Sequence, residues 1–170
     1  MTNPRKPLKL NVGFIVNNEV GYSRDFPFDY ETIRVAEDLE LRDFVGTARF
    51  SRTAQGLLLT GQFRAELDLQ CARCLRDFAQ TVQWDITELF AFNEKSLTDS
   101  ELLVPEDAQI DIAPFVRDYA LTEIPINPVC KPDCKGLCPT CGQDLNQKDC
   151  GHRADQNDSP FASLKDLFNN

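Results

Sequence analysis

Histidine and long apolar runs are scarce in this sequence of 170 residues, and both shortages exclude functions. His152 is the single histidine, so a histidine-rich metal site is excluded and any Ser-His-Asp or Cys-His mechanism would depend on it alone. The apolar runs reach only a few residues, whereas a membrane-spanning helix needs about 20. The N-terminus shows neither a long apolar segment nor a small-residue cleavage site. We therefore expect no secretory signal and a cytoplasmic protein.

Basic residues are also in short supply. Eighteen Lys and Arg stand against 27 Asp and Glu, a net charge of −9. Because non-specific affinity for nucleic acids comes from Lys and Arg that displace counterions, this balance argues against a general polyanion binder. The acidic excess lies mainly in residues 61–110, which hold four basic and ten acidic side chains. Its densest part, residues 93–111, fits either a solvated linker or a docking surface for a basic protein partner.

Cysteine, by contrast, is abundant. Seven cysteines occur in two groups separated by 56 positions, and His152 follows the second group. An odd number of cysteines without export argues against a disulfide framework and favours metal binding. The candidate ligands are eight: Cys71, Cys74, Cys130, Cys134, Cys138, Cys141, Cys150 and His152.

Two four-ligand zinc sites would use all eight candidates, because structural zinc prefers thiolate and imidazole in a closed tetrahedron. The strongest local signal is Cys138-Pro-Thr-Cys141 followed by glycine, a tight knuckle that brings two sulfurs to one point. The favoured partition joins Cys138, Cys141, Cys150 and His152 in one site, and joins Cys71, Cys74, Cys130 and Cys134 in the other.

Other interpretations remain open at this point. Spacing alone also permits a site made of Cys130, Cys134, Cys138 and Cys141, and iron suits four-thiolate knuckles as well as zinc does. Cys71 and Cys74 could form a redox dithiol, although such motifs usually begin a helix in a βαβ unit. Some cysteines could instead be isolated buried residues. No His-Glu-x-x-His pattern is present, so a catalytic zinc is disfavoured and we expect a protein that is not an enzyme.

Hydrophobic periodicity places these motifs on secondary structure. Alternating apolar residues predict a strand over 8–16 and two amphipathic strands over 57–71 and 78–92. The two amphipathic strands flank Cys71-Ala-Arg-Cys74 and predict a β-hairpin with the cysteine pair at its tip. Residues 39–50 have extended character, and residues 53–56 predict a turn whose glycine can take positive φ. A helix is expected over 112–123, capped by Asp111 and ended by Pro125.

These elements predict an α+β fold, an antiparallel β-meander with a helix and a C-terminal zinc-knuckle tail. The sheet spans roughly residues 8–92. The expected domains are 1–126, the sheet with its helix, and 127–170, a Cys-rich tail packed on the hairpin at 71–74. Such a tail is too poor in large apolar residues to hold its shape without a metal. Phe161, Leu164 and Leu167 suggest a short final helix.

The order of these elements resembles that of the YceD family, the large ribosomal RNA subunit accumulation proteins. The resemblance covers most of the chain, and its cysteine motifs are specific in combination. It rests on the Leu-rich N-terminal strand and on Leu69–Leu75 (LQCARCL), Ile110–Ile126 (IDIAPFVRDYALTEIPI), Cys130 with Cys134, Lys135–Asn146 (KGLCPTCGQDLN) and Ser159–Leu167 (SPFASLKDL).

This resemblance implies a cytoplasmic, non-enzymatic factor that supports large-subunit ribosomal RNA accumulation and ribosome biogenesis. The expected partner is a ribosomal protein or a large-subunit assembly intermediate that meets the acidic face. Limited RNA contact could come from Arg73, Arg76, Lys131 and Lys135, which would otherwise compensate anionic zinc–thiolate centres. The competing functions are a thiol redox protein that uses Cys71 and Cys74, and a zinc-ribbon adaptor in transcription. The sequence does not specify the oligomeric state.

Overall fold

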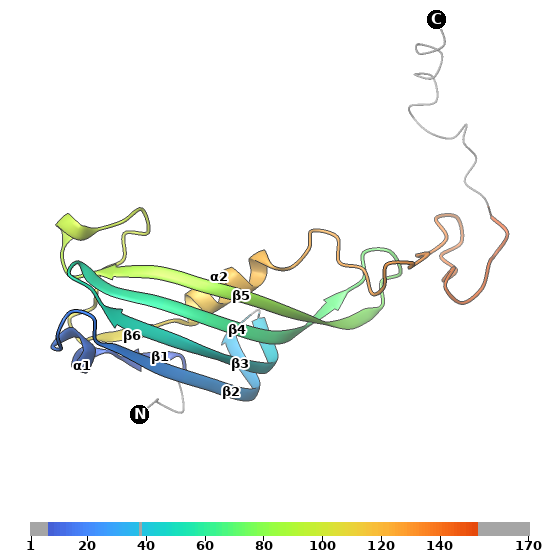
Figure 1. Cartoon of the computed structure of the whole chain (residues 1–170). Helices are drawn as coiled ribbons and strands as arrows, with labels where there is room; N and C mark the ends of the chain where they lie inside the picture. The colour runs from blue at the N-terminus through green and yellow to red at the C-terminus, as the bar shows by residue number, and fades with distance from the viewer. Residues whose placement is uncertain (1–6, 38, 153–170) are drawn as a thin grey trace, which may run out of the picture. The chain divides into compact units, whose positions relative to one another are not determined.

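The computed structural model describes residues 7–37 and 39–152 (Figure 1). The chain divides into two compact units. The first, called the sheet unit below, comprises Met1–Asp68 and Ala79–Ile126, and the second, called the cysteine unit, comprises Leu69–Phe78 and Asn127–Asn170. The hairpin tip therefore groups with the C-terminal part of the chain. The predicted packing of the whole tail stays a prediction, and the predicted final helix near Phe161 lies outside the described residues.

The regular structure follows the predicted α+β class. Strands β2 to β5 form a four-stranded sheet in chain order, and β1 pairs with β6 in a small second sheet. The pairings of β1 with β6, β2 with β3 and β3 with β4 are all antiparallel. The element bounds are β1 Lys9–Asn11, α1 Gly13–Val16, β2 Ser23–Ala36, β3 Leu39–Arg52, β4 Gly56–Gln70, β5 Asp77–Ala91, the 3-10 turn η1 Glu94–Ser96, β6 Gln109–Asp111 and α2 Ala113–Thr122.

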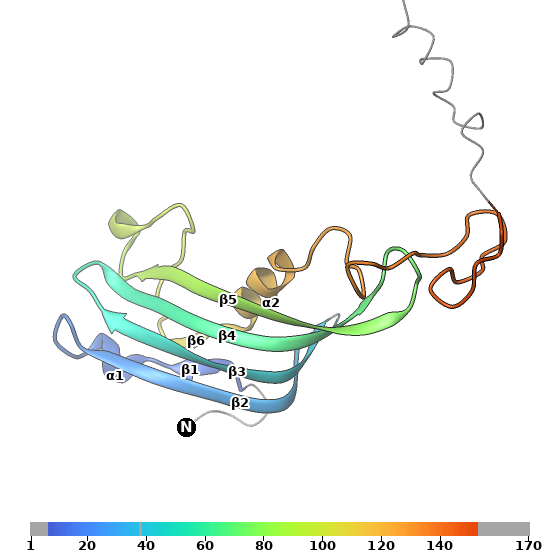
Figure 2. The same cartoon turned by 45° about the vertical axis from the view of Figure 1, so that its right-hand side comes forward.

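The central sheet is half-buried because its strands alternate between apolar and polar residues. In β4 every second residue from Leu57 to Leu67 is buried, and the same holds in β5 from Val82 to Ile86. The alternation predicted for residues 57–71 and 78–92 is thus confirmed. The two α-helices and the β1–β6 pair lie on one face of this sheet, and the other face is open (Figures 1 and 2).

An aromatic stack forms the middle of the sheet unit's core. The ring of Phe63 stacks on Phe44, with centroids 5.5 Å apart, and on Trp84, with centroids 5.9 Å apart. Two glycines make room for it. A Cβ at Gly46 would lie 2.4 Å from Cδ1 of Phe63, and a Cβ at Gly61 would lie 2.5 Å from its Cε2. The ring therefore occupies space that any other residue at these two positions would fill.

Helix α2 agrees with the helix predicted over 112–123. Its buried residues are Val116 and Ala120, which face the sheet. Phe115 meets Phe90 of β5 edge-on, with ring centroids 5.6 Å apart. The N-cap is Ile112, which makes no side-chain cap hydrogen bond, so the cap predicted at Asp111 is one residue too early. Asp111 instead accepts a hydrogen bond from the N–H of Ala113 at 3.0 Å, just before the helix.

The strand predicted over residues 8–16 is wrong beyond residue 11. The side-chain oxygen of Asn11 accepts the N–H of Gly13 at 3.0 Å, and the carbonyl of Val12 accepts the N–H of Ile15 at 2.9 Å. These bonds turn the chain into α1, which buries Ile15 completely. Strand β1 is consequently short, and it pairs with β6 instead of joining the meander.

Strand β2 was not predicted, although it is an edge strand of the larger sheet. Its residue Pro27 has no N–H to donate and is tolerated because one side of an edge strand needs no partner. Asp25 and Asp29 on the same strand are exposed. A proline and repeated charges on an edge discourage pairing with another chain.

The turn predicted at residues 53–56 is confirmed, since Thr53 donates its N–H to the carbonyl of Gly56 at 2.9 Å. The reason for the glycine differs from the expected one. Gly56 is not among the glycines with positive φ. Instead, a Cβ at this position would lie 2.1 Å from the carbonyl oxygen of Phe90. Close approach of two backbones, and not turn geometry, requires glycine here.

The acidic segment 93–111 is an ordered part of the sheet unit. It contains η1 and β6, and Ala91 at the end of β5 exchanges backbone hydrogen bonds with Leu102 and Val104 at 2.8 and 2.9 Å. Asp107 lies 3.7 Å from the Lys9 ammonium. The description as a solvated linker therefore does not fit this segment.

The two units differ in charge. The sheet unit holds 11 Lys and Arg against 20 Asp and Glu, a net charge of −9, whereas the cysteine unit holds seven of each and is neutral. The whole acidic excess of the chain belongs to the sheet unit. Among the described residues, no helix is both long enough and apolar enough to cross a membrane.

Candidate metal centres in the cysteine unit

Two turns of identical backbone pattern present the Cys-x-x-Cys pairs. In the first turn, the N–H of Cys71 donates to the carbonyl of Arg76 and the N–H of Leu75 donates to the carbonyl of Cys71, both at 2.9 Å. In the second, the N–H of Cys138 donates to the carbonyl of Gln143 at 2.9 Å and the N–H of Gly142 to that of Cys138 at 2.8 Å. Each turn thus folds one cysteine pair into a knuckle.

The first group of thiols consists of Cys71, Cys74, Cys130 and Cys134. The four sulfurs lie within 4.8 Å of one another. The Sγ atoms of Cys71 and Cys134 are 3.9 Å apart, and those of Cys74 and Cys130 are 3.7 Å apart. Three of the four residues are buried, and Phe78, Val129 and Leu137 pack around them. Hairpin and tail cysteines therefore converge at one point.

The second group consists of Cys138, Cys141, Cys150 and His152, whose ligand atoms also lie within 4.8 Å of one another. It is more open, because Cys141 and His152 are exposed and only Cys138 is buried. All seven cysteines are free thiols. The grouping corresponds to the partition that the spacing favoured, with Cys130 and Cys134 beside the hairpin pair and not beside Cys138 and Cys141.

A network of polar contacts joins the two knuckles. The Arg73 guanidinium donates to the carbonyl of Cys134 at 2.9 Å, and the Arg76 guanidinium lies 3.1 Å from the Asp144 carboxylate. Asn146 donates its side-chain amide to Asp144 at 2.8 Å and points the same amide at the sulfur of Cys134 at 3.5 Å. Asp144 and Asn146 are thus supporting residues of the first group.

Sequence reasoning did not assign these supporting roles. Asp144 and Asn146 lie in the Gly-Gln-Asp-Leu-Asn stretch that follows the second knuckle. The sequence signal for their role was an Asp and an Asn two positions apart, close to the cysteines. Their function depends on hydrogen bonds to residues about 70 and 12 positions away in the chain. Such pairings are not visible in local spacing.

Gly136 permits the two knuckles to approach. Its φ is +75°, and a Cβ there would lie 2.9 Å from the carbonyl oxygen of Arg73. The next residue, Leu137, donates its N–H to that same carbonyl at 2.9 Å. Both the left-handed backbone and the close approach require glycine at this position.

Electrostatics in the two groups favour thiolate ligands. Backbone N–H groups, chiefly that of Cys130, lower the pKa of Cys71 to about 6. The N–H groups of Cys141 and Thr140 likewise lower the pKa of Cys138 to about 6. Each group therefore holds one thiol that is ionised at neutral pH, and the thiolate is the form that binds metals.

The remaining thiols crowd one another. Burial, and next the neighbouring thiols of Cys74, Cys71 and Cys134, together raise the pKa of Cys130 to about 12. Four thiolates this close repel each other unless a cation lies between them. A bound dication reverses this repulsion and deprotonates its thiol ligands. The donor sets, four sulfurs in one group and three sulfurs with an imidazole in the other, fit zinc.

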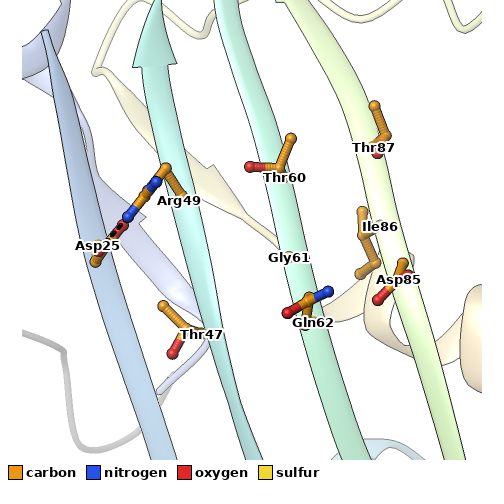
Figure 3. A pocket seen from close by; sticks show the side chains of 9 residues that line it. All are labelled: Asp25, Thr47, Arg49, Thr60, Gly61, Gln62, Asp85, Ile86 and Thr87. Carbon is orange, nitrogen blue, oxygen red and sulfur yellow. Dashed lines mark hydrogen bonds and ion pairs between the residues drawn. The ribbon is translucent and has the colours of Figure 1, made fainter.

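A shallow depression of about 430 Å³ lies on the open face of the four-stranded sheet (Figure 3). Arg49 donates to both carboxylate oxygens of Asp25 at 2.6 and 2.8 Å, and this hydrogen bonding lowers the pKa of Asp25. The rest of its polar lining consists of Thr47, Thr60, Gln62, Asp85 and Thr87. Among residues 7–37 and 39–152, no cysteine, histidine or lysine lines the depression, so its chemistry there is that of a hydrated polar surface.

Comparison with known proteins places this arrangement in a family. The family described as large ribosomal RNA subunit accumulation protein YceD matches residues 59–168, which include both cysteine groups. No solved structure matches the chain.

Curated relatives occur in bacteria and plants. An uncharacterized protein of Mycobacterium tuberculosis is 37% identical over 124 residues, which are 71% of this chain and 59% of the relative. An uncharacterized protein of Bacillus subtilis is 32% identical over 105 residues, 61% of each chain. A maize protein named as a chloroplastic YCED homologue is 33% identical over 95 residues, 56% of this chain and 28% of the relative. The aligned part is thus about three fifths of the mycobacterial protein. From the family match over more than half of its length, this chain belongs to the YceD family of large ribosomal RNA subunit accumulation proteins.

Proposed function

We propose that this protein is a non-enzymatic, zinc-binding factor that supports accumulation of large-subunit ribosomal RNA. Family membership over residues 59–168 is the observation that carries this proposal. The protein works in a compartment that holds ribosomes, here the cytoplasm. Its partner is a ribosomal protein or an assembly intermediate of the large subunit.

Two zinc ions complete the cysteine unit in this proposal. Cys71, Cys74, Cys130 and Cys134 hold one, and Cys138, Cys141, Cys150 and His152 hold the other. The convergence of each set within 4.8 Å supports it. The cysteine unit has no helix or named strand after Asn127 in its described part. Without a metal its few apolar contacts would have to hold the fold, and segments of this size seldom manage that.

The protein acts through protein contacts more than through RNA contacts. The sheet unit carries a net charge of −9 and would be repelled by phosphates. Three of the four basic residues near the thiols are engaged within the cysteine unit. Arg73 bonds the Cys134 carbonyl, Arg76 pairs with Asp144, and Lys131 lies 3.5 Å from Asp133. These contacts within the cysteine unit compete with phosphates for the three cations, which supports a smaller role for RNA contacts.

Depletion tests the assembly role. Cells that lack the protein should contain less large-subunit ribosomal RNA and fewer large subunits in a sucrose-gradient profile, while the small subunit persists in excess. Wild-type protein supplied from a plasmid is the control and should restore both. Unchanged levels of the large subunit and its RNA after full depletion would contradict the proposal.

Native mass spectrometry tests the zinc content. We expect two zinc ions per chain, one after Cys74→Ser and one after Cys141→Ser, because each variant removes a ligand of a different group. A Ser100→Ala variant, outside both groups, should keep two. A single zinc in the wild-type protein would contradict the two-site assignment, and iron in place of zinc would correct the metal.

A thiol redox protein is the second candidate, because the lowered pKa of Cys71 would also suit a reactive thiolate. Alkylation of the metal-loaded protein separates the two functions. Rapid labelling of Cys71 or Cys74 favours the redox function, whereas protection of both until a chelator is added favours the metal site.

A further inference from the structure

The two edge strands of the larger sheet differ in how they are protected. Strand β2 forms one edge and β5 the other (Figure 2). Strand β2 carries Pro27 and three exposed carboxylates, which discourage pairing with another chain. In β5, by contrast, residues 79–85 (AQTVQWD) contain no proline and no lysine, and Asp85 is their single charge. An edge without such protection is a template for another strand.

The backbone groups of β5 alternate in direction. Phe92, just after the strand, donates its N–H to the carbonyl of Gln55, which leads into β4, at 3.0 Å. Ala91 donates its N–H to the carbonyl of Leu102, on the other side, at 2.8 Å. Because these directions alternate along a strand, the odd-numbered residues of β5 face outward. Thr87 follows the same rule, since its backbone hydrogen-bonds the Tyr119 hydroxyl of α2.

The rest of the chain covers only the last part of this edge, at Ala91 and Thr87. The outward-facing residues before them are exposed, and they are Ala79, Thr81, Gln83 and Asp85. Among the described residues, no segment other than β4 hydrogen-bonds the backbone of these four. A row of N–H and C=O groups is therefore open to a further strand.

Charge is distributed unequally between the two edges. Residues 1–68 of the sheet unit, which contain β2, hold nine Lys and Arg against ten Asp and Glu, a net charge of −1. Residues 79–126, which contain β5, hold two against ten, a net charge of −8. A segment rich in Lys and Arg therefore complements the β5 edge. A second copy of this chain would bring another acidic segment against the first and is disfavoured.

A depression of about 830 Å³ leaves room for the side chains of an added segment. It is lined by Gln83 and Asp85 of β5 and by Thr122 and Glu123 of α2, together with residues of β3 and β4. Among its lining residues in the described chain, Arg64 is the one Lys or Arg, against the carboxylates of Asp85 and Glu123. Its charged lining is thus acidic on balance.

We propose that the β5 edge between Ala79 and Asp85 binds an extended, Lys- and Arg-rich segment of a large-subunit ribosomal protein as a fifth strand of the sheet. The β5 backbone supplies the hydrogen bonds of strand addition. The acidic residues 79–126 select a basic segment. The inference rests on the proposed function in taking the partner from the large subunit.

Photo-crosslinking of the full-length protein locates the partner. A diazirine amino acid at position 81 should crosslink to one basic protein in the mixture of RNA and proteins dissociated from purified large subunits. The same probe at position 29, on the β2 edge, is the control and should not crosslink to it. No adduct at position 81, or an adduct only to RNA, to a second copy or to residues 153–170 of the same chain, would overturn the proposal.

A synthetic peptide of the crosslinked segment tests strand addition on the wild-type protein. N-methylation of alternate peptide residues should weaken binding at least tenfold for one alternate set and less than threefold for the other, because only one set faces β5. The bound peptide should also slow amide exchange at Thr81, Gln83 and Asp85. Equal effects of the two methylated sets, or unchanged exchange at these amides, would contradict strand addition.

Proline substitutions test the edge from the side of the protein. Gln83→Pro removes one outward N–H and should weaken peptide binding at least tenfold, while Gln83→Ala stays within threefold. Asp29→Pro makes the same change on the β2 edge, in phase with the natural Pro27, and should bind within twofold of the wild type. If Gln83→Pro folds and binds the peptide as the wild type does, the proposal is overturned. If that variant does not fold, the methylated peptides decide.

These binding experiments are independent of the depletion experiment. If depletion lowers large-subunit RNA but position 81 gives no adduct, the edge proposal fails and the proposed function stands. If position 81 crosslinks to a basic ribosomal protein but depletion leaves the RNA unchanged, the proposed function fails and the edge proposal stands.

Discussion

Gly56 allows strands β4 and β5 to approach closely because it has a hydrogen atom where alanine has a methyl group. We predict that Gly56→Ala destabilises the sheet unit by about 2 kcal/mol or more, the usual range for overpacking a core. The added Cβ would lie 2.1 Å from the Phe90 carbonyl oxygen and 2.9 Å from the Ala91 Cα, and both atoms are backbone that cannot rotate away. Urea unfolding followed by Trp84 fluorescence measures the effect.

Gly13→Ala is the control for that change. A Cβ at Gly13 would lie 3.3 Å from the Asn11 side chain and 3.4 Å from the Ala108 Cβ, distances that small shifts can relieve. Its unfolding midpoint should stay close to that of the wild type. Equal losses in both variants would show that the Phe90 contact does not limit the packing.

A second pair of glycines isolates the contact between the knuckles. Gly136 and Gly142 have similar φ values of +75° and +72°, but only a Cβ at Gly136 meets a neighbour, the Arg73 carbonyl at 2.9 Å. We predict that Gly136→Ala lowers the thermal midpoint of the cysteine unit more than Gly142→Ala does. Both variants share the cost of a left-handed alanine, about 1 kcal/mol, so their difference reports the steric contact alone.

Hydrogen exchange at the amides of residues 134–137 is the measurement for this pair. Faster exchange in Gly136→Ala than in Gly142→Ala is the expected result, because the Leu137 N–H would lose its bond to the Arg73 carbonyl. Identical exchange rates in the two variants would contradict the prediction, because the contact of Gly136 with the Arg73 carbonyl would then contribute nothing to stability.

At the scale of elements, α2 is tied to β5 by a polar bond beside an apolar contact. The Tyr119 hydroxyl donates to the Glu88 carboxylate at 2.9 Å, and the Ser100 hydroxyl donates to the other oxygen of that carboxylate at 2.8 Å. We predict that Tyr119→Phe costs about 1–3 kcal/mol, as expected for losing a hydrogen bond to a charged group.

The same residue predicts a pH dependence. Burial, and then the Glu88 carboxylate, raise the pKa of Tyr119 above its ordinary value of 10.0. The folded protein therefore holds this proton more tightly than the unfolded chain does. Its contribution to stability is complete below pH 10 and is lost as the pH rises through the folded-state pKa. The stability difference between the wild type and Tyr119→Phe should stay constant up to about pH 10 and shrink as the pH rises above that value.

Urea midpoints at several pH values measure that difference, and Tyr22→Phe serves as the control. When the stability of a tyrosine variant is subtracted from that of the wild type at each pH, the contributions of lysines and cysteines that titrate in the same range cancel. A difference that grows with pH would contradict the assignment of the shift to burial and Glu88.

Local periodicity explains which elements were predictable. The alternation of residues 57–71 and 78–92 and the 3.6-residue period of 112–123 are properties of the segments themselves, and the structure confirms them. Strand β2 carried the same signal in Phe26, Phe28 and Tyr30, but Pro27 in its middle argued against a strand. Only its position at the edge resolves this conflict, and that position depends on the whole sheet.

Pairings between distant segments were beyond local patterns. Strands β1 and β6 have three residues each and meet across about 100 positions of sequence. In the cysteine unit, spacing identified the eight residues that gather, because knuckles are local turns. It did not identify Asp144 or Asn146, whose partners come from other segments. The acid-rich segment 93–111 was ambiguous for the same reason, since its order comes from contacts with β5 and β1.

For the whole molecule, we predict that removing the metal loosens one unit and spares the other. A strong chelator should raise hydrogen exchange throughout residues 69–78 and 127–152 and leave β2 and β3 protected. The reason is that the sheet unit has its own core of aromatic residues, whereas the proposed zinc ions would hold the cysteine unit, with a binding free energy on the order of 10 kcal/mol in small zinc peptides. Re-adding zinc should restore the original exchange. Loss of protection in β2 and β3 would show that the units unfold together.

The cysteine unit is built from two separate segments of the chain, so the ribosome makes its first half well before its second half. Fifty-five residues lie between Cys74 and Cys130. A metal bound to both cysteines would therefore close a loop of the chain that contains β5 and α2. By the relation used for covalent crosslinks, such a ring removes about 4 kcal/mol of chain entropy from the unfolded state. During synthesis the hairpin tip leaves the ribosome first. Cys71 and Cys74 then lack the other two thiols of their group until Cys134 has also emerged. The proposed first zinc site can therefore form only after the ribosome has translated helix α2.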